Sequence, residues 1–184
     1  KLNRVFILLQ KNIAAMKEIL QTERCILREL TPEDAAFAFE LNLDPLVFKY
    51  TGDGPFASIE DARKFLENYD YRKLHDMGRW GVERKSDGKL LGWCGLKYHP
   101  DLEEVDLGYR FLIQHRNEGY ATETSLGCLD YGFNTLNLDR IVANAVKENG
   151  ASIKVMQKIG MQFCKETTLH DQASVQYEIF RKIK

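Results

Sequence analysis

The spacing of apolar residues along the chain predicts short strands and amphipathic helices in alternation. Strand-like patterns occur at residues 25–30, 79–84, 89–98, 105–113, 140–146, 161–166 and 175–182. Helical spacing, often behind a capping residue, occurs at residues 31–43, 58–69, 121–133 and 149–158. The prolines and glycines of residues 44–57 predict a loop there. The resulting order, β-α-α-β-β-β-α-β-α-β-β, predicts an α/β fold with a mixed sheet.

The N-terminal residues carry a pattern of their own. Apolar side chains recur there at helical spacing, namely Phe6, Leu9, Ile13, Met16 and Leu20. We therefore expect an amphipathic helix over residues 4–20, so that residues 1–20 are a helical extension and residues 21–184 are a single domain. A second interpretation is that Met16 is the natural start and that residues 1–15 are an upstream extension.

Composition narrows the class of protein without identifying it. The chain has 184 residues, 44% hydrophobic and 29% charged, with a net charge of −1, which is typical of a globular domain. This charge gives no pull toward nucleic acid or an anionic membrane, so neither is expected as a partner. The four cysteines are widely separated and form no CxxC pair, which favours free buried thiols and a reducing, cytoplasmic location. No His, Cys or acid cluster shows ligand spacing, so no metal is expected.

The most informative short segment is Arg116–Ala121, with the sequence RNEGYA. It lies between the apolar run that ends at Ile113 and the predicted helix that begins near Ala121. A small-residue loop that opens a helix presents free backbone N–H groups and the positive end of the helix dipole to one point. The segment therefore predicts a binding site for the phosphate of a ligand.

Several strings of residues resemble the GNAT superfamily of N-acetyltransferases, and within it the RimJ/RimL-type branch. The loop fits the family pattern Q/R-x-x-G-x-G/A. The wider strings VDLGY at 105–109, GYATE at 119–123, NGAS at 149–152 and KIGM at 158–161 add specificity, as does TERCILR at 22–28. The resemblance covers about residues 16–182. It implies a GNAT fold, in which helices flank a mixed, mostly antiparallel central sheet, and acetyl-CoA as co-substrate without a metal.

The resemblance also implies which residues bind the cofactor. Arg116 to Ala121 would wrap the pyrophosphate, with Gly119 and Ala121 small enough for close approach. Arg116 would contact a phosphate or, equally, be a solvated surface residue. Free main-chain groups near Phe111 would meet the thioester. The complete set of implied cofactor contacts is Phe111, Leu112, Ile113, Arg116, Asn117, Glu118, Gly119, Tyr120, Ala121, Thr122 and Asn149.

Three residues are candidates for catalysis by the same resemblance. The amine must lose a proton before it attacks, and the family places a Glu where this chain has Asp106. Glu104 lies two residues earlier and on the same face of that strand, so either a water relay to Asp106 or solvent-facing roles for both acids are open. Ser152 would lie near the CoA sulfur. His99 is expected to face solvent, and His170 lies in the last hairpin loop, where a surface role is favoured.

The sequence leaves the acceptor open. The predicted reaction moves an acetyl group from acetyl-CoA to a primary amine by direct attack, because no cysteine is placed as an acyl carrier. A protein N-terminus, a polyamine or another small amine all fit, and a homodimer is compatible with the pattern. The alternative is a non-catalytic module of the same fold that binds acyl-CoA or a partner.

Overall fold

The protein is built around one sheet of eight strands. The computed structural model describes residues 17–52, 54–70 and 75–182. The strands lie in the order β1-β2-β3-β4-β5-β6-β8-β7, and every neighbouring pair is antiparallel except β5–β6. Their bounds are β1 Glu18–Gln21, β2 Cys25–Arg28, β3 Gly78–Arg84, β4 Leu90–His99, β5 Glu104–Phe111, β6 Arg140–Val146, β7 Gln162–Leu169 and β8 Gln172–Phe180. The predicted mixed, mostly antiparallel sheet flanked by helices is confirmed.

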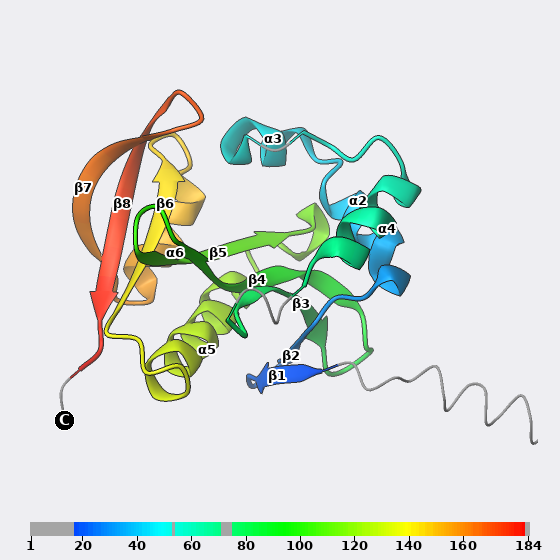
Figure 1. Ribbon diagram of the computed structural model, residues 1–184, viewed down its shortest axis with the longest axis horizontal. Coiled ribbons are helices and arrows are strands. Elements are labelled where there is room, and N and C mark those ends of the chain that lie inside the picture. Colours follow the sequence, from blue (N-terminus) through cyan, green and yellow to red (C-terminus); the bar gives the residue numbers. More distant parts are fainter. Residues whose placement is uncertain (1–16, 53, 71–74, 183–184) are drawn as a thin grey trace, which may run out of the picture.

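Helices cover both faces of this sheet (Figure 1). The helix α5 lies against one face, while α2, α3 and α4 lie on the other side. Short 3₁₀ turns at Pro32–Asp34 and Ile113–His115 precede α2 and α5. The helices span α2 Ala35–Leu41, α3 Pro45–Thr51, α4 Ile59–Asn68, α5 Tyr120–Asn134 and α6 Gly150–Lys158.

The two parallel strands, β5 and β6, are paired over only a short distance. The pairing recorded between β5 and β6 is a single position, Asp106 with Val142. Each of these strands is paired along its whole length with its other neighbour: β5 pairs with β4 from Glu104 to Phe111, and β6 pairs with β8. A sheet whose two halves are each well paired but joined at one position opens into a wedge between them. In Figure 1, β6, β7 and β8 accordingly form a separate panel beside β5.

Two apolar cores hold the helices to the sheet. The larger core lies between the sheet and α5 and contains the fully buried Trp80, Leu96 and Ile141. The smaller core lies under α2 and α4 and is built around Leu30 and Leu66. All four cysteines are free, as expected, and three of them are buried, whereas Cys164 is half-buried.

The helix predicted over residues 4–20 is wrong where the structure describes it. Glu18 to Gln21 form β1, which pairs with β2 and places Leu20 against the larger core. A short apolar run fits either periodicity, and the neighbouring strand edge decides the outcome because it satisfies the backbone N–H and C=O groups. Residues 1–16 lie outside the described part of the chain, so the rest of the predicted extension stays a prediction.

The loop predicted over residues 44–57 contains a helix, α3. Asp44 caps it by accepting a hydrogen bond from the Leu46 N–H at 2.9 Å, and Pro45 occupies the first helical position. Gly52 ends the helix with φ +68°, a left-handed conformation that glycine adopts readily. These are the ordinary start and stop signals of a helix, but the helix is only seven residues long and its apolar spacing is too short to stand out.

Candidate active site

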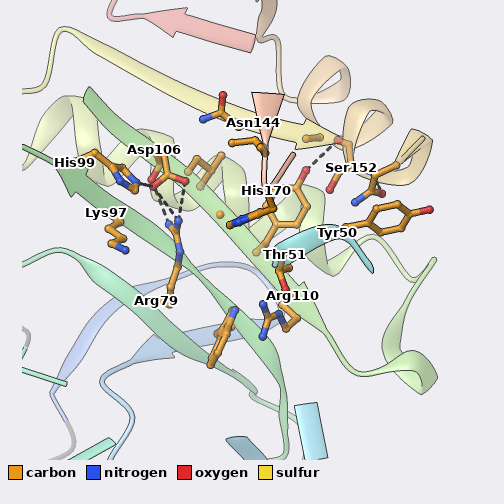
Figure 2. Close-up of a pocket in the computed structure, with 18 of the residues that line it drawn as sticks. Tyr50, Thr51, Arg79, Lys97, His99, Asp106, Arg110, Asn144, Ser152 and His170 are labelled. Atoms are coloured by element: carbon orange, nitrogen blue, oxygen red, sulfur yellow. Dashed lines mark hydrogen bonds and ion pairs between the residues drawn. The ribbon is translucent and has the colours of Figure 1, made fainter. Parts of the chain in front are cut away.

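The wedge between β5 and β6 opens into a cavity of about 700 Å³ (Figure 2). Leu107 to Arg110 of β5 line one wall, and Val142 to Ala145 of β6 line the other. Residues from α3 and the β7–β8 turn form a roof, since the Gln172 side chain donates to the Lys49 carbonyl at 2.9 Å and the His170 ring packs on Gly52. The cavity therefore lies where the sheet lacks backbone pairing, with main chain on two sides.

Asp106 lies at one end of this cavity and is held by two basic side chains. Nη2 of Arg79 donates to both carboxylate oxygens of Asp106 at 2.9 and 2.8 Å, and Nε2 of His99 lies 2.7 Å from Oδ1 (Figure 2). Burial alone would raise the pKa of Asp106, but the Arg79 charge and the His99 contact outweigh burial and lower that pKa. Asp106 is therefore ionised at neutral pH and is itself a weak base.

The ionised carboxylate fixes the tautomer of His99. An ionised carboxylate only accepts hydrogen bonds, so Nε2 of His99 must carry the proton that points at Asp106. In neutral His99 the other ring nitrogen, Nδ1, then remains as a proton acceptor. His99 lines the cavity and its side chain is 38% exposed, so the expectation that it simply faces solvent is wrong.

Glu104 lines the same cavity, two residues before Asp106, as the strand periodicity predicts. Its carboxylate accepts hydrogen bonds from Arg140 at 2.8 Å and from Gln176 at 3.1 Å. Burial opposes ionisation of Glu104, but these two contacts lower its pKa. Glu104 is consequently a second ionised and already paired carboxylate.

The opposite end of the cavity is formed by the start of α6. Asn149 caps this helix, because its side chain accepts from the Ser152 N–H at 3.2 Å. Asn149 and Ser152 both line the cavity, and the hydroxyl of Tyr109 donates to the Ser152 carbonyl at 3.0 Å. Burial raises the pKa of Tyr109 to about 12, so this phenol stays protonated.

The predicted phosphate loop has the geometry of an anion site. Asn117 and Gly119 adopt φ +63° and +86°, and Gly119 is the capping residue of α5. The backbone N–H groups of the first turn have no partner within a helix, and Tyr120, Ala121 and Thr122 form that turn here. An added Cβ at Gly119 would meet Arg24 Nη2 at 3.4 Å, an ordinary van der Waals contact, so the guanidinium of Arg24 lies directly against this position.

Arg24 also holds the loop in place through its side-chain contacts. Its Nη1 donates to the Glu118 carbonyl at 3.1 Å, its Nε to Glu123 at 2.6 Å, and its guanidinium lies 4.2 Å from the centre of the Tyr120 ring. Tyr120 itself is buried. The conformation of the loop is thus fixed by residues of the β1–β2 turn.

Arg116 has a role that the sequence did not predict. Its Nε donates to the Phe111 carbonyl at 2.9 Å, and its Nη2 forms an ion pair of 2.5 Å with Asp44, the residue that caps α3. Arg116 is therefore neither a solvated residue nor a side chain already directed to a phosphate, and it ties the loop to α3.

The main chain expected to be free near Phe111 is partly occupied. The Leu112 N–H donates to the Leu91 carbonyl at 3.0 Å, and the Phe111 carbonyl accepts from Arg116. Phe111 and Leu112 are buried, whereas Ile113 is 61% exposed. The part of β5 that lines the cavity instead lies before Phe111, at Glu104 and at Asp106 to Arg110.

Sequence reasoning missed Arg79 and the contact between His99 and Asp106. The short turn at Pro100–Glu103 allows the register to be counted: it places His99 opposite Glu104 and Lys97 opposite Asp106, so His99 reaches Asp106 as a diagonal neighbour. Arg79 left no comparable signal, because it reaches Asp106 from β3 across the intervening strand β4. His170 was placed correctly in the last hairpin turn, but the roof over the cavity depends on α3, which was not predicted.

Comparisons with known proteins agree with this architecture. The model of the GNAT acetyltransferase domain matches residues 24–162. An uncharacterized N-acetyltransferase, YoaA of Bacillus subtilis (strain 168), is 32% identical over 151 residues, which is 80% of this chain and 84% of YoaA. The crystal structure of a GNAT-family acetyltransferase from Bacillus anthracis superposes with a TM-score of 0.75 at 28% identity, covering 88% of this chain and 97% of that one.

A relative with a named substrate is more distant. The spermidine N(1)-acetyltransferase of Escherichia coli (strain K12) is 25% identical over 138 residues, covering 73% of this chain and 70% of that protein.

The chain belongs to the GNAT family of acetyltransferases, and it is an enzyme that transfers an acyl group from acyl-CoA. Within the described residues, no group of three or more His, Cys, Asp or Glu side chains is placed to hold a metal ion. None of the helices in the described part of the chain is long and apolar enough to cross a membrane.

Proposed function

We propose that this enzyme acetylates a primary amine with acetyl-CoA, in the manner of the RimJ/RimL-type branch, by direct attack of the amine on the thioester. The observation that carries the proposal is the wedge between the parallel strands β5 and β6. Parallel strands place the loops that follow them at one edge of the sheet, and here those loops lead into α5 and α6. A phosphate-bearing donor can therefore bind at Gly119 while its acyl arm enters the wedge.

The donor arm has suitable partners along this path. Alternate residues of a strand direct their N–H and C=O groups to opposite sides, so β5 from Leu107 onward presents backbone groups to the wedge. An extended pantetheine arm can accept and donate hydrogen bonds there as an added strand would. The N–H groups that line the wedge are also candidates to stabilise the oxyanion formed from the thioester carbonyl.

The acceptor needs a proton acceptor, and His99 fits that need better than Asp106. A primary ammonium must lose one proton before its nitrogen attacks the thioester carbon. In this proposal Nδ1 of His99 takes that proton, directly or through one water, while Asp106 orients the ring and stabilises the imidazolium. Arg79 keeps Asp106 ionised, so Asp106 is a positioning residue, and Glu104 is the alternative acceptor.

The leaving sulfur departs as the C–S bond breaks and the amide forms. An ordinary thiol has a pKa of about 8.5, whereas burial raises the pKa of Tyr109 to about 12. Proton transfer from Tyr109 to the thiolate is therefore unfavourable by roughly 3.5 pH units, or about 5 kcal/mol. We propose that Ser152 acts only as a hydrogen-bond donor to the sulfur and that the proton comes from the attacking nitrogen or from water.

The proposal is tested by turnover of acetyl-CoA with a panel of amines. Release of free CoA thiol and the mass of the acetylated product are measured for N-terminal peptides, polyamines and simple monoamines. We expect thiol release that depends on the amine and is matched by the acetylated product. Binding of acetyl-CoA without turnover of any amine contradicts the proposal and favours a binding module.

Gly119→Trp is expected to raise the KM for acetyl-CoA by about tenfold or more, since a loss of 1.4 kcal/mol in binding is tenfold. The indole would crowd the first turn of α5, where the phosphates are proposed to bind. Gly88→Trp is the matched control, because Gly88 shares the positive φ of Gly119 and has no atom within 4 Å of an added Cβ, but it lies in the β3–β4 turn. An equal KM for both variants contradicts the loop assignment.

A further inference from the structure

One wall of the cavity is aromatic and includes none of the residues proposed to bind the donor. Phe65 of α4 lies between Phe56 and Tyr69, with ring centroids 5.4 and 5.5 Å apart, and all three rings line the cavity. Trp93 of β4 lines it as well. Phe65 remains 39% exposed although rings flank it on both sides. Exposed aromatic rings gathered in a concave site are typical of a surface that binds an apolar group of a ligand.

The aromatic wall adjoins the proposed proton acceptor. The Tyr69 hydroxyl accepts a hydrogen bond from the backbone N–H of Arg79 at 3.0 Å, and the side chain of Arg79 continues to Asp106. An acceptor whose apolar group packs on Phe65 and Tyr69 therefore has its amine within reach of the His99–Asp106 pair. The wall and the pair line the same cavity.

The charges in the cavity do not suit a polycation. Among the described residues that line it, the carboxylates are Glu104 and Asp106, and both are already paired with arginines. Arg79, Lys97 and Arg110 also line it, and the guanidinium of Arg110 lies over Trp93 at 4.8 Å. A polyamine needs ionised carboxylates for its remaining ammonium groups, whereas a monoamine is neutral once it has lost its proton.

We propose that the acceptor is a primary monoamine whose carbon chain carries a flat aromatic group, and that polyamines are poor acceptors. This inference rests on the proposed amine acetylation. The ring packs against Phe65 and Phe56, and the amine nitrogen points toward His99. The chemistry is shared by a small arylalkylamine and by a peptide with an aromatic N-terminal residue.

The test compares kcat/KM for matched acceptors. Phenethylamine is set against n-propylamine and spermidine, and a tripeptide beginning with phenylalanine is set against one beginning with glycine. We expect an aryl preference of about tenfold or more in at least one pair, because a buried apolar group discriminates by 10-fold to 200-fold. Preference in the small amines alone identifies a small molecule as the source, and preference in the peptides alone identifies a protein N-terminus.

Phe65→Ala should lower kcat/KM for phenethylamine far more than kcat/KM for n-propylamine, so that most of the aryl preference is lost. Phe163→Ala is the matched control, because Phe163 is 55% exposed on β7 and does not line the cavity. Phe65→Leu keeps most of the apolar volume and replaces the alanine variant if that variant fails to fold. It should lower the aryl preference severalfold.

Three results would overturn the inference. One is spermidine as the best acceptor, which leaves amine acetylation itself intact. Another is an equal loss for n-propylamine and phenethylamine in a folded Phe65 variant, which would make Phe65 structural. The third, no thiol release with any amine, overturns both this inference and the proposed function.

Discussion

A His99→Gln variant is expected to lose about 10²-fold to 10⁴-fold in kcat, the usual contribution of a positioned general base. Glutamine can still donate a hydrogen bond to Asp106, so the carboxylate keeps its partner, but it offers no basic nitrogen. The KM for acetyl-CoA should stay within a small factor, because His99 lies at the Asp106 end of the cavity, away from Asn149 and the loop at Gly119. Steady-state kinetics across pH measures both effects.

The pH profile separates a base from a merely structural residue. Wild-type kcat should fall on the acid side as the base becomes protonated, and this limb should vanish or move in the variant. His75→Gln is the control, because His75 is exposed and contacts Tyr98 instead of Asp106. An unchanged kcat in His99→Gln would return the role to Glu104 or to bulk water.

Arg79→Met should destabilise the fold by about 3–5 kcal/mol, the usual loss when one partner of a buried ion pair is removed. The side chains of Arg79 and Asp106 are only 19% and 15% exposed, so the carboxylate left behind is poorly solvated. Combining Arg79→Met with Asp106→Leu should restore part of the loss. Urea unfolding of the single and double variants measures the coupling between the two residues.

The same variants report on acid stability. Because the folded protein lowers the pKa of Asp106, its stabilising contribution is complete above the unfolded pKa and is lost as the pH falls through the folded pKa. Wild-type stability should therefore drop at acidic pH more steeply than that of the double variant. Arg84→Met, which removes an exposed ion pair with Asp87, is the control and should change stability less. Equal losses in the two arginine variants contradict a buried Arg79–Asp106 pair.

Local pattern was sufficient for most of the fold. Arg140 to Val146 is a strand with the predicted bounds, and α5 and α6 begin within one residue of the predicted positions, because capping residues and periodicity agree there. Local pattern failed at β1 and α3, where only a few residues are involved. In β1 the pairing with β2 overrides helical spacing, and in α3 the capping signals had to be weighed against a run rich in proline and glycine.

The candidate site was predictable only where it follows from a single segment. The turn at Gly119 and the cap at Asn149 are local, so their backbone conformations could be read from residue types. Arg79 and the aromatic wall depend on which strands and helices become neighbours, and spacing along the chain does not encode that. Arg116 shows a further limit of the sequence. It occupies a position of the family motif, but its side chain forms an ion pair with Asp44 in this protein.

The single pairing between β5 and β6 makes the sheet itself part of the binding equilibrium. From Leu107 onward, the side of β5 that faces β6 is unpaired, like the edge strand of a sheet. A ligand that forms backbone hydrogen bonds there would connect β6, β7 and β8 to the rest of the sheet. Such a ligand favours the native state over the unfolded chain by mass action, so the melting temperature should rise with ligand concentration. Amide hydrogens along β5 and β6 should also exchange more slowly when the gap is filled.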